Sequence, residues 1–163
     1  MRALLAAITE TWIAPGRVVR RLAATDPGEE KLLGWLMIAS LVSFLVRSPQ
    51  TLHSGLESDT LAGLFGAQIV AAMLFGPLAF YALAALSHLA IRVSGGKGSG
   101  RNARLALFWS AFALQPLVIA VAILGWLVPG LHSTLLLVLG VFFLSIWLRA
   151  LLAVDGGETD NLS

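Results

Sequence analysis

The sequence contains no cysteine, and only 12% of its 163 residues are charged. Without cysteine the chain can form no disulfide, no thiolate metal ligand and no thiol nucleophile. A soluble domain is about 25% charged, so this chain has too little charge to cover a surface that faces water. Because 58% of its residues are hydrophobic, we expect lipid to be the solvent for much of the chain.

Charge is absent from two long stretches, Leu61 to Ile91 and Leu105 to Val128. All acidic residues lie outside the hydrophobic runs. This argues against an acid-driven proton or cation pump, because such pathways usually need buried carboxylates. The enzyme signatures G-x-S-x-G and H-E-x-x-H do not occur. We therefore expect no catalytic residues and no cofactor, and no metal site, because His53 and His132 lie far from His88.

The uncharged runs predict an all-α integral membrane bundle with four transmembrane helices, forming a domain at residues 27–154. The predicted spans are residues 30–47, 61–92, 105–128 and 131–154. The run Leu61 to Ile91 would be about 46 Å long as one helix, which exceeds the roughly 30 Å hydrocarbon layer. It could therefore also form two short spans that turn at Gly76-Pro77. Four spans place every basic residue except Arg47 on one side, so the positive-inside rule favours a single long helix.

The same charge argument predicts a multi-pass protein of the bacterial inner membrane with both termini in the cytoplasm. Residues 155–163 are acidic and glycine-containing, and we expect them to form a disordered tail. The expected partners are the bilayer with its anionic headgroups, and a protein partner or further copies of the chain in a homo-oligomer. Nucleic acid is not an expected partner.

Residues 1–26 form a separate amphipathic segment before the first span. Apolar side chains recur in it at helical spacing and are followed by arginines (Leu4, Leu5, Ile8, Trp12; Arg17, Arg20, Arg21). One interpretation is a pair of short helices in the headgroup plane, with the arginines toward anionic lipid. The other is a lead-in whose apolar side packs on the bundle. Asp26 is predicted to cap the first span, with Pro27 at the first helical position.

A glycine-rich basic loop separates the second and third spans. Its glycines disfavour regular structure, and it contains basic residues but no acid. It does not match a phosphate-binding P-loop, because Ile91 occupies the position at which that motif requires its first glycine. We expect a flexible cytoplasmic loop that contacts lipid headgroups or an acidic partner, unless it serves topology alone. Its candidate contact residues are Gly95, Gly96, Lys97, Gly98, Arg101 and Arg104.

Polar residues inside the spans are few. His88 is the one ionisable side chain deep in an uncharged run, and Gln115 on the next helix could reach it. Such a pair predicts either a structural hydrogen bond or a proton relay or ligand site.

Small residues and prolines mark positions for packing and bending. Gly63, Ala67 and Ala71 recur every four residues, a stripe that would let a neighbouring helix pack closely. Pro77 and Pro116 are predicted to kink their helices. Kinked helices could line a transport path through the membrane. A small transporter or channel with kinked helices around Gly76-Pro77 and Pro116 is therefore the alternative to a scaffold.

Several segments together resemble the YIP family, small polytopic membrane proteins named for their interaction with Ypt/Rab GTPases. The resemblance rests on residues 87–92 (SHLAIR), 95–99 (GGKGS), 104–109 (RLALFW) and 114–117 (LQPL), with Trp12…Pro15 before the first span. It covers most of residues 10–150, although the family typically has five spans. The resemblance implies a non-enzymatic membrane scaffold of the bacterial type.

Overall fold

The computed structural model describes residues 2–57, 60–96 and 98–156. In this part of the chain every regular element is a helix. Four helical segments are long and apolar enough to cross a membrane: Glu29–Leu56, Leu61–Val93, Gly100–Leu127 and His132–Val154. The predicted all-α bundle with four spans is therefore confirmed. Leu61–Val93 is one crossing, so the alternative of two short spans is not formed.

The spans are divided into shorter elements. In chain order the elements are α1 (Arg2–Ile13), α2 (Pro15–Ala24), α3 (Glu29–Glu57), α4 (Leu61–Val70), the π-helix η1 (Ala71–Phe75), α5 (Gly76–Val93), α6 (Gly100–Ala113), α7 (Gln115–Leu127), the 3-10 helix η2 (Pro129–Leu131) and α8 (His132–Gly156).

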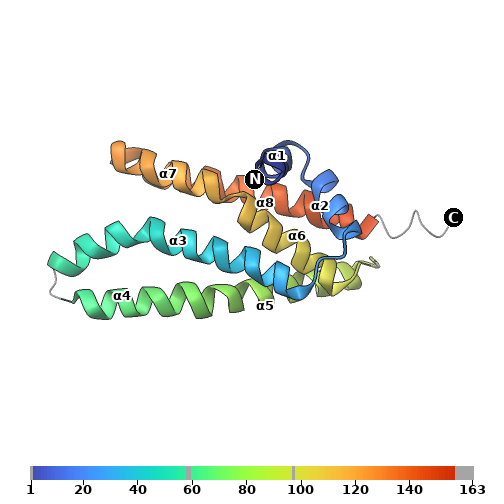
Figure 1. Ribbon diagram of the computed structural model, residues 1–163, viewed down its shortest axis with the longest axis horizontal. Coiled ribbons are helices and arrows are strands. Elements are labelled where there is room, and N and C mark those ends of the chain that lie inside the picture. Colours follow the sequence, from blue (N-terminus) through green and yellow to red (C-terminus); the bar gives the residue numbers. More distant parts are fainter. Residues whose placement is uncertain (1, 58–59, 97, 157–163) are drawn as a thin grey trace.

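All four spans run along the long axis of the molecule (Figure 1). The end of α5, the start of α6, the helix α2 and the C-terminal part of α8 lie together at one end, which we call the loop end. The end of α3, the start of α4 and the end of α7 lie at the other, which we call the distal end. Helix α1 is seen almost end-on in Figure 1, so it lies across the bundle.

Helix α3 is longer than the predicted span and continues past Arg47 through Pro49 to Glu57. Two hydroxyls in this polar part bond carbonyls of the preceding turn of the same helix. Ser48 donates to the Phe44 carbonyl at 2.9 Å, and Thr51 donates to the Arg47 carbonyl at 3.3 Å. These bonds satisfy polar side chains within the helix, so the polar stretch need not leave it. The helix thereby gains the length that its short uncharged core lacks.

The start of α3 also differs from the prediction. The helix begins at Glu29, and Asp26 lies outside it with a φ of 47°. A left-handed conformation is tolerated best by short polar side chains such as aspartate. Asp26 therefore ends the turn after α2, and its carboxylate is free to pair elsewhere.

Both proline sites interrupt regular helical pairing. Pro116 has no N–H to donate to the preceding turn, and α6 ends at Ala113 before α7 begins at Gln115. The π-helix η1 lies just before Pro77, and the Gly76 N–H bonds the Ala71 carbonyl five residues back. A widened turn of this kind accommodates the missing donor of the following proline.

The buried core is concentrated at the loop end. Nine of the 14 residues of α6 are buried, whereas α7 buries only Gly125 and α4 buries none. Trp109 is 1% exposed and lies edge-on against Trp35, with ring centroids 5.0 Å apart. The bundle is therefore closely packed around α6 and more open toward the distal end.

Helix α2 packs tightly on α8. Val18 and Val19 are fully buried. A Cβ added at Gly16 would come within 2.7 Å of the Ala153 Cβ and 3.4 Å of the Arg149 carbonyl. Neither group can rotate away, so this approach requires glycine.

We predict opposite outcomes for the same substitution at two glycines. Gly16→Ala should destabilise the protein by about 1–3 kcal/mol, because the added methyl overpacks the α2–α8 contact. Gly34→Ala should be neutral or stabilising by up to about 1 kcal/mol, because nothing lies within 4 Å of a Cβ there. Thermal unfolding of the purified variants measures both effects. Equal melting temperatures would show that α2 is not held closely against α8.

Candidate functional site

The arginines of the glycine-rich loop are held in ion pairs at the loop end. Arg104 contacts Glu29 through two atoms, with Nε 3.0 Å from Oε1 and Nη2 donating to Oε2 at 3.1 Å. Tyr81 also donates to Glu29 Oε1 at 3.0 Å. Arg101 pairs with Asp26 and donates to the Pro27 carbonyl. Arg101 and Arg104 therefore already have partners within the chain, and their expected contact with lipid or an acidic partner stays a prediction.

The glycines of this loop form helix caps. Gly95 has a φ of 86°, a conformation that glycine adopts without strain. The Gly96 N–H bonds the Ile91 carbonyl at 2.9 Å, as in a Schellman cap that closes α5. Ser99 then caps α6 by accepting from the Asn102 N–H at 3.2 Å. The segment expected to be a flexible loop up to Arg104 is therefore helical from Gly100, with Gly98 buried before it. Lys97 lies outside the described residues.

His88 and Gln115 do not meet. His88 lies at the loop end, where its Cδ2 would be 3.4 Å from a Cβ added at Gly100. Gln115 follows Gly100 by 15 residues along α6 and α7, which is about 22 Å of helix. Its Nε2 donates to the Ala111 carbonyl of its own helix at 2.9 Å. The expected contact between them is corrected, because they occupy different depths of the bundle.

In the described part of the chain the small-residue stripe is not closely packed against a neighbouring helix. Gly63, Ala67 and Ala71 are all exposed, and nothing lies within 4 Å of a Cβ added at Gly63. Helix α4 contacts α3 through bulkier side chains. Phe65 lies edge-on to Phe44 with ring centroids 6.5 Å apart, and Gln68 donates to the Phe44 carbonyl at 2.9 Å.

Helices α1 and α2 form one unit, which we call the α1–α2 platform. Trp12 Nε1 donates to the Ala113 carbonyl at 3.0 Å, and Trp109 Nε1 donates to the Thr11 hydroxyl at 3.0 Å. Glu10 and Arg21 join the two helices through an ion pair of 2.9 Å. The platform is therefore anchored to α6 by two indole hydrogen bonds.

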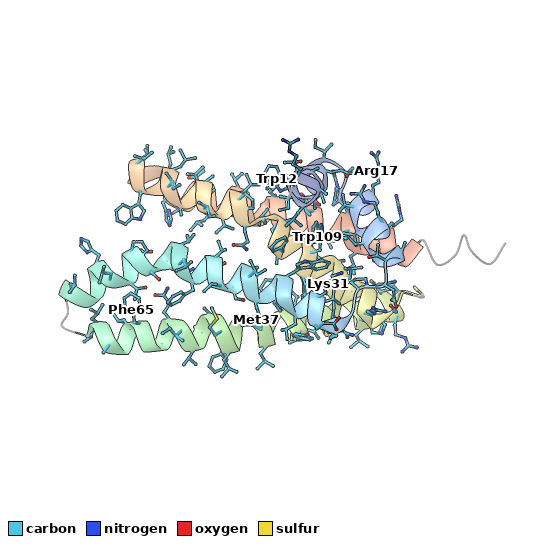
Figure 2. All side chains as sticks on the ribbon, viewed as in Figure 1. Trp12, Arg17, Lys31, Met37, Phe65 and Trp109 are labelled. Atoms are coloured by element: carbon cyan, nitrogen blue, oxygen red, sulfur yellow. The ribbon has the colours of Figure 1, made fainter. Side chains whose placement is uncertain are left out.

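The outer side of the platform carries two kinds of exposed residue. Leu4, Leu5 and Ile13 are exposed on α1, and Ile13 is 82% exposed. Arg17 and Arg20 are exposed on α2, and Arg17 points away from the bundle in Figure 2. The apolar side of the platform packs on the bundle, as the second interpretation of residues 1–26 states, since Ile8, Val18 and Val19 are buried there. The first interpretation, a position in the headgroup plane, stays a prediction.

A cleft opens between α3, α4, α7 and α8. Its volume is about 780 Å³. Its lining includes polar residues (Ser43, Arg47, Gln68 and His132) and aliphatic ones (Leu64, Val118 and Leu139). A smaller cavity of about 260 Å³ shares Ser43, Arg47 and Gln68 with the cleft and reaches Gln115. The cleft therefore brings polar side chains from three spans into the distal half of the bundle.

Two buried oxygens have no hydrogen-bond partner in the described part of the chain, Gln68 Oε1 at the cleft and Gln115 Oε1 at the smaller cavity. Buried polar atoms are nearly always satisfied, so each such atom needs an explanation. Sequence reasoning named Gln115 but not Arg47 or Gln68 as site residues. The sequence did distinguish Arg47, because four spans place it on one side of the membrane and every other basic residue on the opposite side.

We predict that the Trp109–Thr11 hydrogen bond holds α1 in place. Thr11→Val should cost about 1–3 kcal/mol, because it leaves a buried indole N–H without a partner. Thr9→Val is the matched control, since Thr9 is exposed and its hydroxyl bonds only carbonyls of α1. Amide hydrogen exchange should become faster across α1 in the first variant alone. Similar exchange in the two variants would contradict this role of Thr11.

Comparison of the chain with protein-family models, with curated proteins and with solved structures finds no match. The resemblance to the YIP family is not tested by these comparisons and stays a prediction.

Proposed function

We propose that this multi-pass membrane protein is a non-enzymatic scaffold of the YIP-like class that organises the membrane around its α1–α2 platform. The observation that carries the proposal is the arrangement of α1 and α2. Helix α1 lies across the spans with exposed leucines, and the neighbouring helix α2 presents exposed arginines (Figure 1). Amphipathic helices with this combination lie in the headgroup region of a bilayer.

The basic residues support an orientation with the loop end in the cytoplasm. Among the described residues Arg47 is the basic residue at the distal end, and the others belong to elements at the loop end. An excess of lysine and arginine marks the cytoplasmic side of a multi-pass protein. The platform would then face the anionic lipids of the cytoplasmic leaflet.

Because the loop arginines are paired, we assign the contact with headgroups or a partner to the platform. Arg101 and Arg104 hold the start of α3, so they contribute less to an attractive surface than exposed cations do. Arg17 and Arg20 have no ion pair in the described part of the chain, whereas Arg21 is paired with Glu10. Arg17 and Arg20 are accordingly the residues assigned to headgroup or partner contact.

A small transporter is the second candidate, and the polar cleft is the observation that favours it. Kinked or interrupted helices adjoin the cleft at η1 and at Leu114. Toward the loop end, however, Phe108 and Trp109 are 0% and 1% exposed and fill the bundle. A path through the protein would require these rings to move, so we place the scaffold first.

We predict that the loop end faces the cytoplasm. The chain has no cysteine, so single cysteines can be introduced without removing others. A membrane-impermeant maleimide added to intact cells should label the exposed site of Ser133→Cys at the distal end but not that of Ser94→Cys at the loop end. Labelling of Ser94→Cys in intact cells would reverse the orientation and remove the basis for a cytoplasmic platform.

We further predict that Arg17 and Arg20 recruit anionic lipid. In vesicles that mix phosphatidylglycerol with phosphatidylcholine, the double variant Arg17→Gln/Arg20→Gln should lose about 1 kcal/mol of preference per arginine at low salt. Energy transfer from the tryptophans to pyrene-labelled phosphatidylglycerol measures the lipid next to the protein.

The matched control is Arg17→Lys/Arg20→Lys, which keeps both charges and should keep the preference. Raising the salt concentration should weaken the preference of the wild-type chain, because exposed charges are screened. An unchanged preference in the glutamine variant would show that the platform does not act through these arginines.

A further inference from the structure

The cleft at the distal end has the size and the mixed lining of a ligand site. Small-molecule sites usually enclose about 300–1,000 Å³ and combine an apolar lining with a few placed polar groups. The cleft encloses about 780 Å³, and its lining combines hydroxyl, amide and guanidinium groups with aliphatic side chains. Because α3, α4, α7 and α8 belong to membrane spans, a molecule that satisfies both kinds of group is an amphiphile.

Arg47 brings to this cleft a positive charge that no acid among the described residues pairs with. Its side chain is exposed, lines both cavities and has no ion pair with a described residue. The sequence contains no acid from Thr60 to Val154, so α4 and α7 offer it no counter-ion. A guanidinium in this position binds a carboxylate or a phosphate through parallel hydrogen bonds. The head of the amphiphile is therefore anionic.

Gln68 specifies a second property of the ligand. Its Nε2 donates to the Phe44 carbonyl at 2.9 Å, and a carbonyl can only accept, so the orientation of the amide is fixed. The Oε1 atom is consequently left as an acceptor, and it is buried without a partner. Gln115 is arranged in the same way in the adjoining cavity, with Nε2 bonded to Ala111 and Oε1 unpartnered. The ligand that satisfies Gln68 must donate a hydrogen bond.

The positions of the two residues order the acidic group and the donor along the ligand. Gln68 bonds the carbonyl of Phe44, which precedes Arg47 by three residues on α3. Three residues correspond to about 5 Å along the helix axis, so Gln68 packs about one turn nearer the loop end than the backbone of Arg47. We therefore expect the donor on the loop-end side of the acidic group. An ordinary ester-linked lipid has no donor there, whereas an amide N–H or a hydroxyl meets the requirement.

We propose that this cleft binds an anionic amphiphile with an amide or hydroxyl donor next to its acidic head, as in an N-acyl amino acid. The acid pairs with Arg47, the donor bonds Gln68 Oε1, and the acyl chain lies along Leu64, Val118 and Leu139. The site lies in the opposite end of the bundle from the α1–α2 platform. It depends neither on the proposed scaffold function nor on the orientation of the chain.

The test uses two probes that differ in one atom. N-palmitoylglycine has a carboxylate and an amide N–H, and palmitoyloxyacetate replaces that N–H by an ester oxygen. Binding is measured with the full-length chain in phosphatidylcholine nanodiscs, and partitioning into empty nanodiscs is subtracted. The amide should bind the wild-type chain about three- to tenfold more tightly than the ester, because one hydrogen bond is gained.

Three variants assign the contacts. Gln68→Leu should bind the two probes equally, since the acceptor is gone. Arg47→Gln should weaken both probes about tenfold or more, because a charge-assisted contact is lost. Arg92→Gln removes an exposed charge at the loop end and should leave both affinities unchanged. Ala122→Phe should exclude both probes by filling the cleft while leaving Arg47 and Gln68 in place.

The alternatives give different results. Equal binding of amide and ester by the wild-type chain would mean that water satisfies Gln68, and it would overturn the donor requirement. Tight binding of the neutral N-palmitoylglycinamide, or unchanged affinities in Arg47→Gln, would overturn the anionic head. Normal binding by Ala122→Phe would place the amphiphile elsewhere on the protein. Circular dichroism and melting temperature establish that each variant is folded before its affinity is used.

Discussion

The burial of α6 is the constraint on which the rest of this structure depends. Trp109 and Phe108 at its centre contact Trp35 of α3 and Tyr81 of α5, with ring centroids 5.0 and 4.9 Å apart. The same indole holds α1 through Thr11. At the start of the helix, the arginine pairs with Asp26 and Glu29 hold α3 in place. The core at the loop end is thus organised around a short apolar helix whose charged residues lie within its first five positions.

The interruption at Leu114 separates this packed half from the open half. Helix α6 before it is mostly buried, whereas α7 after it buries one residue. Pro116 is the second residue after the interruption, so the missing hydrogen bond lies where the burial changes. The two halves of the bundle therefore differ in packing, with the apolar core and the platform in one and the polar cleft in the other.

The sequence was sufficient for the spans and insufficient for the contacts between them. The position of an uncharged run such as Leu61 to Ile91 follows from composition, because it is stable only in a bilayer, and the placement of charge around it favours one span over two. The length of α3 does not follow from composition, because the hydroxyls of Ser48 and Thr51 can bond carbonyls of the helix itself. Composition shows that they are polar but not where their hydrogen bonds go.

The candidate sites were harder to predict for a related reason. Arg101 and Arg104 read as free cations because their acidic partners lie 75 residues earlier in the chain. Gln68 lies in the middle of an apolar span, and only its bond to Phe44 shows which of its atoms remains unpartnered. His88 and Gln115 were expected to meet on chemical grounds, but helix length keeps them apart. A local sequence pattern predicts whether a residue lies in lipid or in water better than it predicts which residues it contacts.

The π-helical turn Ala71–Phe75 has a consequence for how one crossing serves two partners. A turn that holds an additional residue rotates everything after it by about 100° relative to an uninterrupted α-helix. Phe65 and Gln68 before the turn are directed at α3, and Tyr81 after it is directed at Phe108 of α6. This rotation directs the side chains before and after the turn to different neighbours. One uninterrupted segment therefore forms part of both the wall of the cleft and the side of the core.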